Sequence, residues 1–298
     1  YQTLDTEVLI WRDRMPVVCS ESLFALDRQT GKKRWDYTPG QGVIINPTIA
    51  AGGGRVYFIE SANPETREVA DGRIKLDALL GRGANLVALD LRTGVKLYSK
   101  PAPLEQLQHI IFLSYTQETL LVTGTKNVLV EGKGRVRYDL AAFDAATGDL
   151  RWQNTQTPIP DHILQGPHGE QVQHSAIVGG TIYNTGFACE LRTGEGVPGW
   201  KWQKSGNCGT LTTSAFCAFS RYSNARMFNL RTGNYTDLTT VIRPGCWVNI
   251  IPAGGLIMIP EQSAGCICGY PIQTSIALLP ESSERLTLPA ARGAPQTH

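Results

Sequence analysis

The sequence carries little charge, and neither sign dominates. Charged residues make up 18% of the 298 residues, against about 25% in an average globular domain. The 28 lysine and arginine residues nearly balance the 26 aspartate and glutamate residues. The net charge of +2 therefore gives no support for a nucleic-acid partner, which needs a basic surface. Hydrophobic residues make up 42%, which excludes a disordered chain because such chains combine low hydrophobicity with high net charge.

Long hydrophobic runs are absent as well. A membrane-spanning helix needs about 18 or more apolar residues. The longest apolar runs, such as Ile110–Leu113 and Leu256–Ile259, have the length of strands. The Ala/Glu/Lys/Leu-rich segments typical of coiled coils are also missing. The chain has 31 glycine and 17 proline residues instead, which indicates many turns. We therefore expect no membrane span and few helices.

A repeated turn pattern is the strongest signal in the chain. Each full copy has an apolar strand-like run, an aspartate, two variable residues, Thr-Gly and then an aromatic residue. The Thr-Gly pairs recur about every 50 residues, which is the length of one four-stranded unit with its loops. The copies are Leu23–Trp35, Leu86–Tyr98, Leu140–Trp152, and two weaker ones at Phe187–Trp200 and Met227–Leu238.

The first copy shows what each residue of the pattern does. The Asp27 carboxylate can accept backbone N–H bonds and open a tight turn. Gly31 can adopt a positive φ, which lets the hairpin close. Trp35 then begins the returning strand and places a large ring against a neighbouring sheet. The same structural roles are predicted for Asp90, Gly94, Asp144, Gly148 and Trp152.

Small sheets of this kind cannot bury both of their faces alone. Stacking them around an axis covers those faces and leaves only short edges, which is the arrangement of a β-propeller. The five turns and the ending segment Thr274–Leu279 predict about six four-stranded antiparallel blades. Further strands are predicted at Arg55–Ile59, Thr119–Thr123, Thr181–Asn184 and Gly255–Ile259.

The pattern Ala-x-Asp-x-x-Thr-Gly-x-x-x-Trp resembles the tryptophan-docking repeat of the pyrroloquinoline-quinone-like (PQQ-like) β-propellers. The segments 25–35 and 142–152 match it fully, and 88–98 matches it except for its aromatic residue. Residues 245–280 also resemble the C-terminal part of secreted bacterial members. The resemblance implies an all-β propeller over residues 1–280. Members of the family usually close with seven or eight blades, so the chain is either a compact propeller or a part of a larger ring. We expect a flexible tail at 281–298, because it is polar and carries Pro and Ala.

A long insertion interrupts the strands at residues 60–85. Ala70–Leu80 is predicted to form a short helix, with Asp71 near its start and Gly81 after its end. A loop of this length on a propeller face often shapes a site, although a surface excursion without function is the more common outcome.

Seven cysteines are present, and five of them follow residue 200. The sequence has no Cys-x-x-Cys or Cys-x-x-Cys-His run, which disfavours zinc ribbons, thioredoxin chemistry and covalent haem. Structural disulfides, buried free thiols and a thiolate metal site remain open. The extracytoplasmic location of the secreted relatives favours disulfides. The preferred pairs are Cys208–Cys217, and Cys246 with Cys266 or Cys268.

The densest group of metal-ligating or acid–base side chains lies between residues 161 and 174. His168, Glu170 and His174 could point into the central channel and bind a metal or a ligand. The alternative is a polar connection whose histidines are hydrogen-bonded between blades. Arg221 and Tyr222 could bind an anion or a sugar by bidentate bonds and stacking, or they could bridge adjacent blades.

Three functions compete at this point. We predict a non-catalytic extracytoplasmic binding or scaffold module with a protein partner or a saccharide ligand, because the repeats account for most of the informative residues. The resemblance makes a PQQ- and Ca²⁺-dependent quinoprotein dehydrogenase the alternative, but such enzymes share a vicinal cysteine pair that this sequence lacks. A metal-assisted polysaccharide lyase or hydrolase would need the histidine segment to meet Arg221 and Tyr222.

Overall fold

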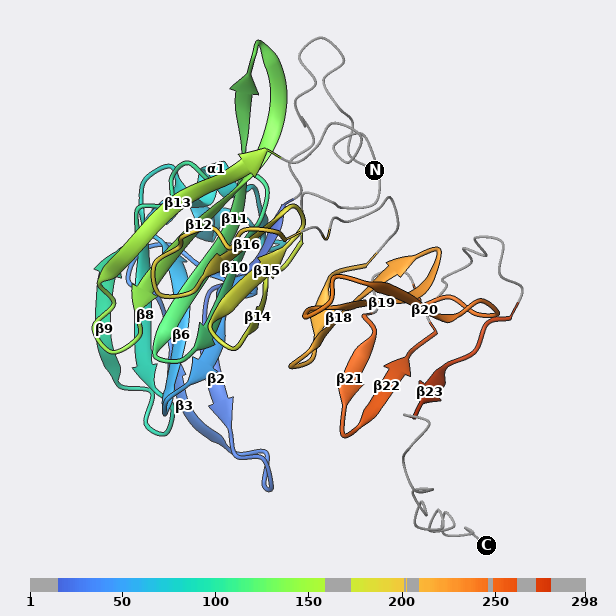
Figure 1. The fold of residues 1–298 in the computed structure, drawn as a ribbon. Coiled ribbons are helices and arrows are strands. Elements are labelled where there is room, and N and C mark those ends of the chain that lie inside the picture. Colours follow the sequence, from blue (N-terminus) through green and yellow to red (C-terminus); the bar gives the residue numbers. More distant parts are fainter. Residues whose placement is uncertain are drawn as a thin grey trace, which may run out of the picture.

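Antiparallel β-strands make up most of the fold (Figure 1). The computed structural model describes residues 16–158, 173–200, 202, 209–245, 249–261 and 272–279. In that part of the chain the strands form six sheets, and they do not close into a ring. The predicted tail at 281–298 lies outside the described residues. The all-β propeller class is confirmed. The six sheets have seven, four, three, four, two and three strands, so they are not six equal four-stranded blades.

The first large sheet contains a four-stranded antiparallel meander. Its strands, in order of pairing, are β5 (Ala50–Gly52), β6 (Arg55–Ser61), β8 (Ala84–Asp90) and β9 (Lys96–Pro101). Three short strands widen the sheet to seven: β1 (Val17–Ser20), β4 (Ile44–Ile45) and β7 (Arg73–Ile74). A separate hairpin of β2 (Leu23–Leu26) and β3 (Lys33–Tyr37) carries the first repeated turn.

The other sheets follow in chain order, each as an antiparallel meander. The second blade comprises β10 (Ile111–Thr116), β11 (Thr119–Val130), β12 (Lys133–Asp144) and β13 (Leu150–Pro158). The third comprises β14 (Ala176–Val178), β15 (Thr181–Asn184) and β16 (Phe187–Glu190). The fourth comprises β17 (Thr212–Thr213), β18 (Cys217–Tyr222), β19 (Asn224–Asn229) and β20 (Tyr235–Thr239). The last comprises β21 (Ile251–Ala253), β22 (Leu256–Ile259) and β23 (Ile276–Leu278).

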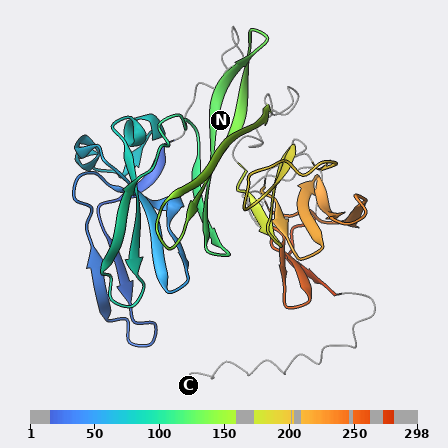
Figure 2. The same cartoon turned by 60° about the vertical axis from the view of Figure 1, so that its left-hand side comes forward.

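The strand predictions are confirmed, with small differences at the ends of β6 and β22 and one large difference in length. The strand expected at Thr119–Thr123 runs on to Val130, because β11 pairs with β12 along its whole length. The end of this hairpin projects beyond the neighbouring strands (Figures 1 and 2). Glu131 and Gly132 form its tip with φ of +51° and +74°.

The insertion packs into the core. It contains a 3-10 helix at Pro64–Glu68 and the helix α1 at Leu76–Leu80; another 3-10 helix lies earlier, at Asn46–Thr48. The predicted helix over Ala70–Leu80 was too long, because Gly72 turns the chain with a φ of +61°. The side chains of Leu76, Leu79 and Leu80 are fully buried. The insertion therefore contributes apolar core as well as surface.

The five Thr-Gly turns close as predicted. At the second turn, Asp90 Oδ1 accepts the backbone N–H of Thr93 (2.8 Å), and the first and third turns have the same bond. Asn229 replaces the aspartate in the fifth turn, and its Oδ1 accepts the backbone N–H of Thr232 (3.1 Å). The turn glycines Gly31, Gly94, Gly148, Gly194 and Gly233 have φ values between +68° and +77°.

Three of the aromatic residues bind the turn of the following blade. Each ring donates a hydrogen bond to the backbone carbonyl that follows the aspartate position of that turn. The pairs are Trp35 Nε1 with Leu91 (3.0 Å), Tyr98 Oη with Ala145 (3.2 Å) and Trp152 Nε1 with Leu191 (3.0 Å). A β-carbon on Gly94 would lie only 2.7 Å from the Trp35 ring, so glycine permits the close approach. We call the turn glycine and this carbonyl a ring seat.

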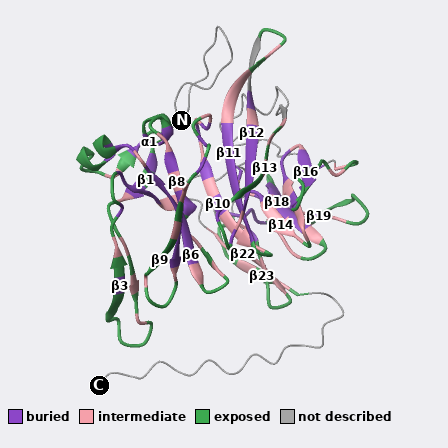
Figure 3. Ribbon diagram, turned by 90° about the vertical axis from the view of Figure 1, so that its left-hand side faces the viewer, coloured by how far each residue is buried: buried purple, intermediate pink, exposed green. Residues whose placement is uncertain are grey.

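Buried residues follow the central strands (Figure 3). The largest apolar cluster joins the first sheet to the second blade and includes Ile59, Leu86, Leu120 and Phe143, all at most 1% exposed. Smaller clusters lie between the later blades. Within the described part of the chain, we find no helix with the length and apolar character needed to cross a bilayer.

Candidate functional site

His174 lies between blades. Its ring packs against Phe112 of β10 with centroids 4.9 Å apart. Its Nδ1 lies 2.8 Å from the Ser175 carbonyl oxygen, and its Nε2 lies 3.5 Å from Ser114 Oγ. Burial lowers the pKa of the His174 imidazole, and the bond to the Ser175 carbonyl raises it by less. These contacts match the expected alternative, in which a histidine is hydrogen-bonded between blades.

Arg221 and Tyr222 lie at the end of β18 on opposite faces, as neighbouring strand residues do. The Arg221 side chain is buried, whereas Tyr222 is 45% exposed. The guanidinium that stacks on the Tyr222 ring belongs to Arg226, 3.7 Å from the ring centroid. The ligand role expected of Arg221 and Tyr222 stays a prediction.

Several predicted site residues lie outside the described residues: His168, Glu170, Cys208, Cys246, Cys266 and Cys268. Cys217 carries a free thiol in the structure, which differs from the predicted Cys208–Cys217 disulfide. Cys19 and Cys189 are also free, and burial raises the pKa of each thiol to about 12. Thiols of this kind stay protonated and are poor nucleophiles. The pairing of Cys246 with Cys266 or Cys268 stays a prediction.

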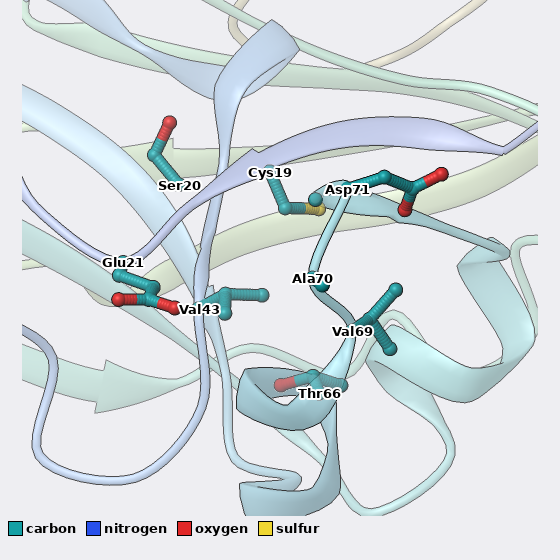
Figure 4. Close-up of a pocket in the computed structure, with 9 residues that line it drawn as sticks. Cys19, Ser20, Glu21, Val43, Thr66, Val69, Ala70 and Asp71 are labelled. Carbon is teal, nitrogen blue, oxygen red and sulfur yellow. The ribbon is translucent and has the colours of Figure 1, made fainter.

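The insertion forms one wall of a small pocket beside β1 (Figure 4). The cavity has a volume of about 230 Å³ and is lined by Cys19, Ser20, Glu21, Val43, Thr66, Val69, Ala70, Asp71 and Gly72. The Cys19 thiol donates to the carbonyl of Val17 (3.5 Å), and the Asp71 carboxylate accepts the backbone N–H of Arg73 (3.0 Å). These two polar groups are engaged in local bonds, and the Ser20 hydroxyl and Glu21 carboxylate also line the cavity.

One face of the β18–β20 sheet gathers aromatic rings around an arginine. We call Tyr222, Arg226, Phe228 and Tyr235 the aromatic–arginine face. The Arg226 guanidinium lies 3.7 Å from the Tyr222 centroid and 5.5 Å from the Tyr235 centroid. Its Nε donates to Asp237 Oδ1 (2.7 Å), which lowers the pKa of the Asp237 carboxyl. Tyr222 and Tyr235 remain 45% and 47% exposed.

Sequence reasoning missed Arg226 and Tyr235. They meet because β19 pairs with β20 in a register that sets Arg226 opposite Asp237 and Phe228 opposite Tyr235, which places Arg226 and Tyr235 on one face. No local motif in the sequence encodes that register.

A cavity of about 400 Å³ adjoins the aromatic–arginine face where the third and fourth blades meet. The Trp200 ring lies between Tyr183 (centroids 4.8 Å apart) and Phe228 (5.4 Å apart). The lining of the cavity also includes Arg231, Gly233 and Asn234, from the fifth Thr-Gly turn. Aromatic walls beside a few polar groups are typical of a ligand or side-chain pocket.

Family comparison agrees with the repeats. The family model described as outer membrane protein assembly factor BamB matches residues 12–231. The chain belongs to this PQQ-like family. No curated protein matches the sequence of this PQQ-like chain.

Solved structures also resemble this PQQ-like protein, at low identity. A europium-containing methanol dehydrogenase is 14% identical with a TM-score of 0.41, over 84% of this chain and 60% of that chain. A quinohemoprotein alcohol dehydrogenase from Comamonas testosteroni is 14% identical with a TM-score of 0.40, over 84% of this chain and 44% of that chain. Sqt1 from Saccharomyces cerevisiae is 11% identical with a TM-score of 0.45, over 85% and 62%. The chain thus spans less than two thirds of the length of these proteins.

PQQ and Ca²⁺ are suggested only by resemblance to this family. Among the residues that the structure describes, no group of three or more His, Cys, Asp or Glu side chains could hold a metal ion. The sequence also has no adjacent cysteines for the vicinal pair of quinoprotein dehydrogenases. We assign no chemical step to this cofactor pair.

Proposed function

We propose that this PQQ-like propeller is a non-catalytic binding or scaffold module that acts outside the cytoplasm on a protein partner. The observation that carries the proposal is the aromatic–arginine face, with Tyr222 and Tyr235 nearly half exposed around Arg226. Tyrosine and arginine are enriched at the energetic centres of protein interfaces. The description of the family as an outer membrane protein assembly factor supports both the location and the kind of partner.

The pre-ordered arginine favours a protein surface as the ligand. Arg226 is held by two rings and by Asp237, so binding would immobilise few additional rotamers. Its remaining guanidinium N–H groups can bind a carboxylate or a backbone carbonyl. A saccharide, which can also stack on exposed tyrosines, is the other ligand that an experiment must separate.

A quantitative binding experiment tests the proposal. The protein is immobilised, cell-envelope extract is passed over it, and each specifically retained protein is purified and its affinity measured. Tyr222→Ala should weaken that affinity about tenfold or more, because truncating a central interface tyrosine removes roughly 1–2 kcal/mol or more. Phe24→Ala is the matched control, since Phe24 is an exposed aromatic residue (57%) on the distant strand β2.

Three outcomes would contradict the proposal. Equal affinities of the two variants for every retained protein would show that the aromatic–arginine face is not part of the interface. If the protein binds oligosaccharides but no protein, and Tyr222→Ala abolishes that binding, the ligand of this face is a saccharide and not a protein. Alcohol oxidation with an artificial dye acceptor, on addition of PQQ and Ca²⁺, would show an enzyme of the quinoprotein type.

A further inference from the structure

The fifth Thr-Gly turn has the build of a ring seat. Gly233 has a φ of +73°, the same as Gly194 in the seat that Trp152 fills. The backbone N–H of Gly233 donates to the Asn229 carbonyl (2.9 Å), as the Gly194 N–H does to Glu190 (2.8 Å). The carbonyl of Leu230 occupies the position of the acceptor in the filled seats.

No ring lies on this seat in the described part of the chain. A β-carbon on Gly233 would meet no atom within 4 Å, whereas one on Gly194 would lie 2.7 Å from the Trp152 ring. Trp200, the aromatic residue of the preceding copy, donates its Nε1–H to the carbonyl of Asn184 (2.9 Å) and not to Leu230.

The sequence explains why Trp200 misses the seat. Trp152 is the fourth residue after its turn glycine, but Trp200 is the sixth after Gly194. The extra residues lie in a segment that contains Pro198, and among the described residues 195–200 the pairing after this turn is a single bridge between Cys189 and Gly196. The Trp200 ring therefore packs between Tyr183 and Phe228 instead.

The space left over is the cavity of about 400 Å³ described above. It is lined both by Gly233 and by the Trp200 and Phe228 rings, so an incoming ring would meet apolar walls and the turn at once. The Leu230 carbonyl can accept an N–H or O–H bond, as Leu91, Ala145 and Leu191 do in the filled seats. These features select an aromatic ring that carries a hydrogen-bond donor.

We propose that the open ring seat at Gly233 is a socket for a tryptophan side chain of a partner protein. The three filled seats supply the argument for the occupant, because the same turn geometry holds an indole twice and a phenol once within this chain. The inference rests on the proposed binding function and adds the chemistry by which the partner is recognised. Arg231 and Asn234, which line the same cavity, would bind polar groups beside the tryptophan.

Binding of 5-fluoroindole, followed by ¹⁹F NMR on the full chain, tests the socket. A ring of this size should bind with a Kd on the order of 1 mM. N-acetyl-L-tryptophanamide should displace it, and N-acetyl-L-leucinamide should not. In ¹H–¹⁵N spectra of the wild type, the amides of Thr232 and Gly233 should shift on titration, whereas those of Thr30 and Gly31 should not.

A matched pair of variants locates the probe. Gly233→Asn introduces asparagine, which tolerates positive φ, and places the asparagine side chain in the seat. Binding of 5-fluoroindole should therefore weaken about tenfold or more. Gly31→Asn is the control: Gly31 has a φ of +68° and equally open space, but its cavity is lined by Asp27, Arg28, Gln29 and Arg34 without a ring. This control should leave the affinity unchanged.

Failure of the socket can be told from failure of the proposed function. The socket is overturned if 5-fluoroindole does not bind, if it shifts only amides remote from the fifth turn, or if both variants weaken it equally. The proposed function depends on Tyr222, which does not line the cavity, and a partner whose affinity falls in Tyr222→Ala but not in Gly233→Asn would leave that function standing.

Discussion

The junction between the third and fourth blades differs from the three junctions before it. At the earlier junctions a tryptophan or tyrosine crosses to the next turn and binds its carbonyl. At the later one the turn glycine has the same φ, but Trp200 turns inward. The turns are alike, so the difference arises from the length of the segment that carries the ring. With two additional residues in this segment, the contact that joins adjacent blades is absent among the described residues, and a cavity lies between them.

The largest effect should come from emptying a filled seat. Trp35→Ala should lower the free energy of unfolding by about 3–5 kcal/mol, because the ring is buried and its removal leaves a cavity between two sheets. Urea unfolding measures the change. Phe24→Ala, on the outer face of the paired strand β2, should cost less than about 0.5 kcal/mol. Similar losses in the two variants would mean that Trp35 does not join the blades.

The two kinds of seat should respond differently to a single methyl group. Gly94→Ala and Gly233→Ala share a cost of about 1–2 kcal/mol for positive φ. At Gly94 the new β-carbon also collides with the Trp35 ring, which adds about 1–3 kcal/mol. The free energies of unfolding of the two variants, measured in urea under the same buffer conditions, check this difference. Equal costs would contradict the distinction between filled and open seats.

The smallest effect concerns charge at the turns. The Arg151 guanidinium beside Asp144 holds the pKa of that carboxyl below its usual value, and the turn N–H groups act in the same direction. A lowered pKa in the folded state stabilises the fold above about pH 4, and this contribution is lost as the pH falls through the lowered pKa. Asp144→Asn should therefore cost less than about 1 kcal/mol at pH 7, and less still at pH 3.

The amide at the fifth turn provides the comparison for this pH dependence. Asn229 accepts the same turn bonds without a charge, so the cost of Asn229→Ala should be equal at pH 7 and pH 3. Unfolding of both variants at the two pH values measures this. A cost at Asp144 that is independent of pH would show that the ionised carboxylate contributes nothing beyond its hydrogen bonds.

The turns and the docking rings could be predicted from the sequence because each depends on a few neighbouring residues. Asp27, Gly31 and Trp35 carry their roles within one hairpin, and the same spacing recurs twice. The longer interval from Gly194 to Trp200 was also visible, but only the structure shows that the ring then packs against Tyr183.

Other features depend on contacts between distant segments. One edge of the first sheet is formed by β7 from within the insertion, and no local pattern marks a two-residue strand. The sequence left His174 either near a channel or hydrogen-bonded between blades, and its contacts with Phe112 and Ser114 could be recognised only with the second blade in place. The stacking of Arg226 on Tyr222 depends on strand register in the same way.

A pair of double-mutant cycles tests the account most directly. One cycle combines Trp152→Ala with Gly194→Ala, and the other combines Trp200→Ala with Gly233→Ala. In the first, a β-carbon on Gly194 collides with the Trp152 ring and also with Asn154 Nδ2 (2.5 Å). Removal of the ring relieves the collision with the ring, so the coupling energy should reach about 1 kcal/mol or more; in the second cycle it should lie near zero. Equal coupling in the two cycles would contradict the claim that the third ring seat is filled and the last is open.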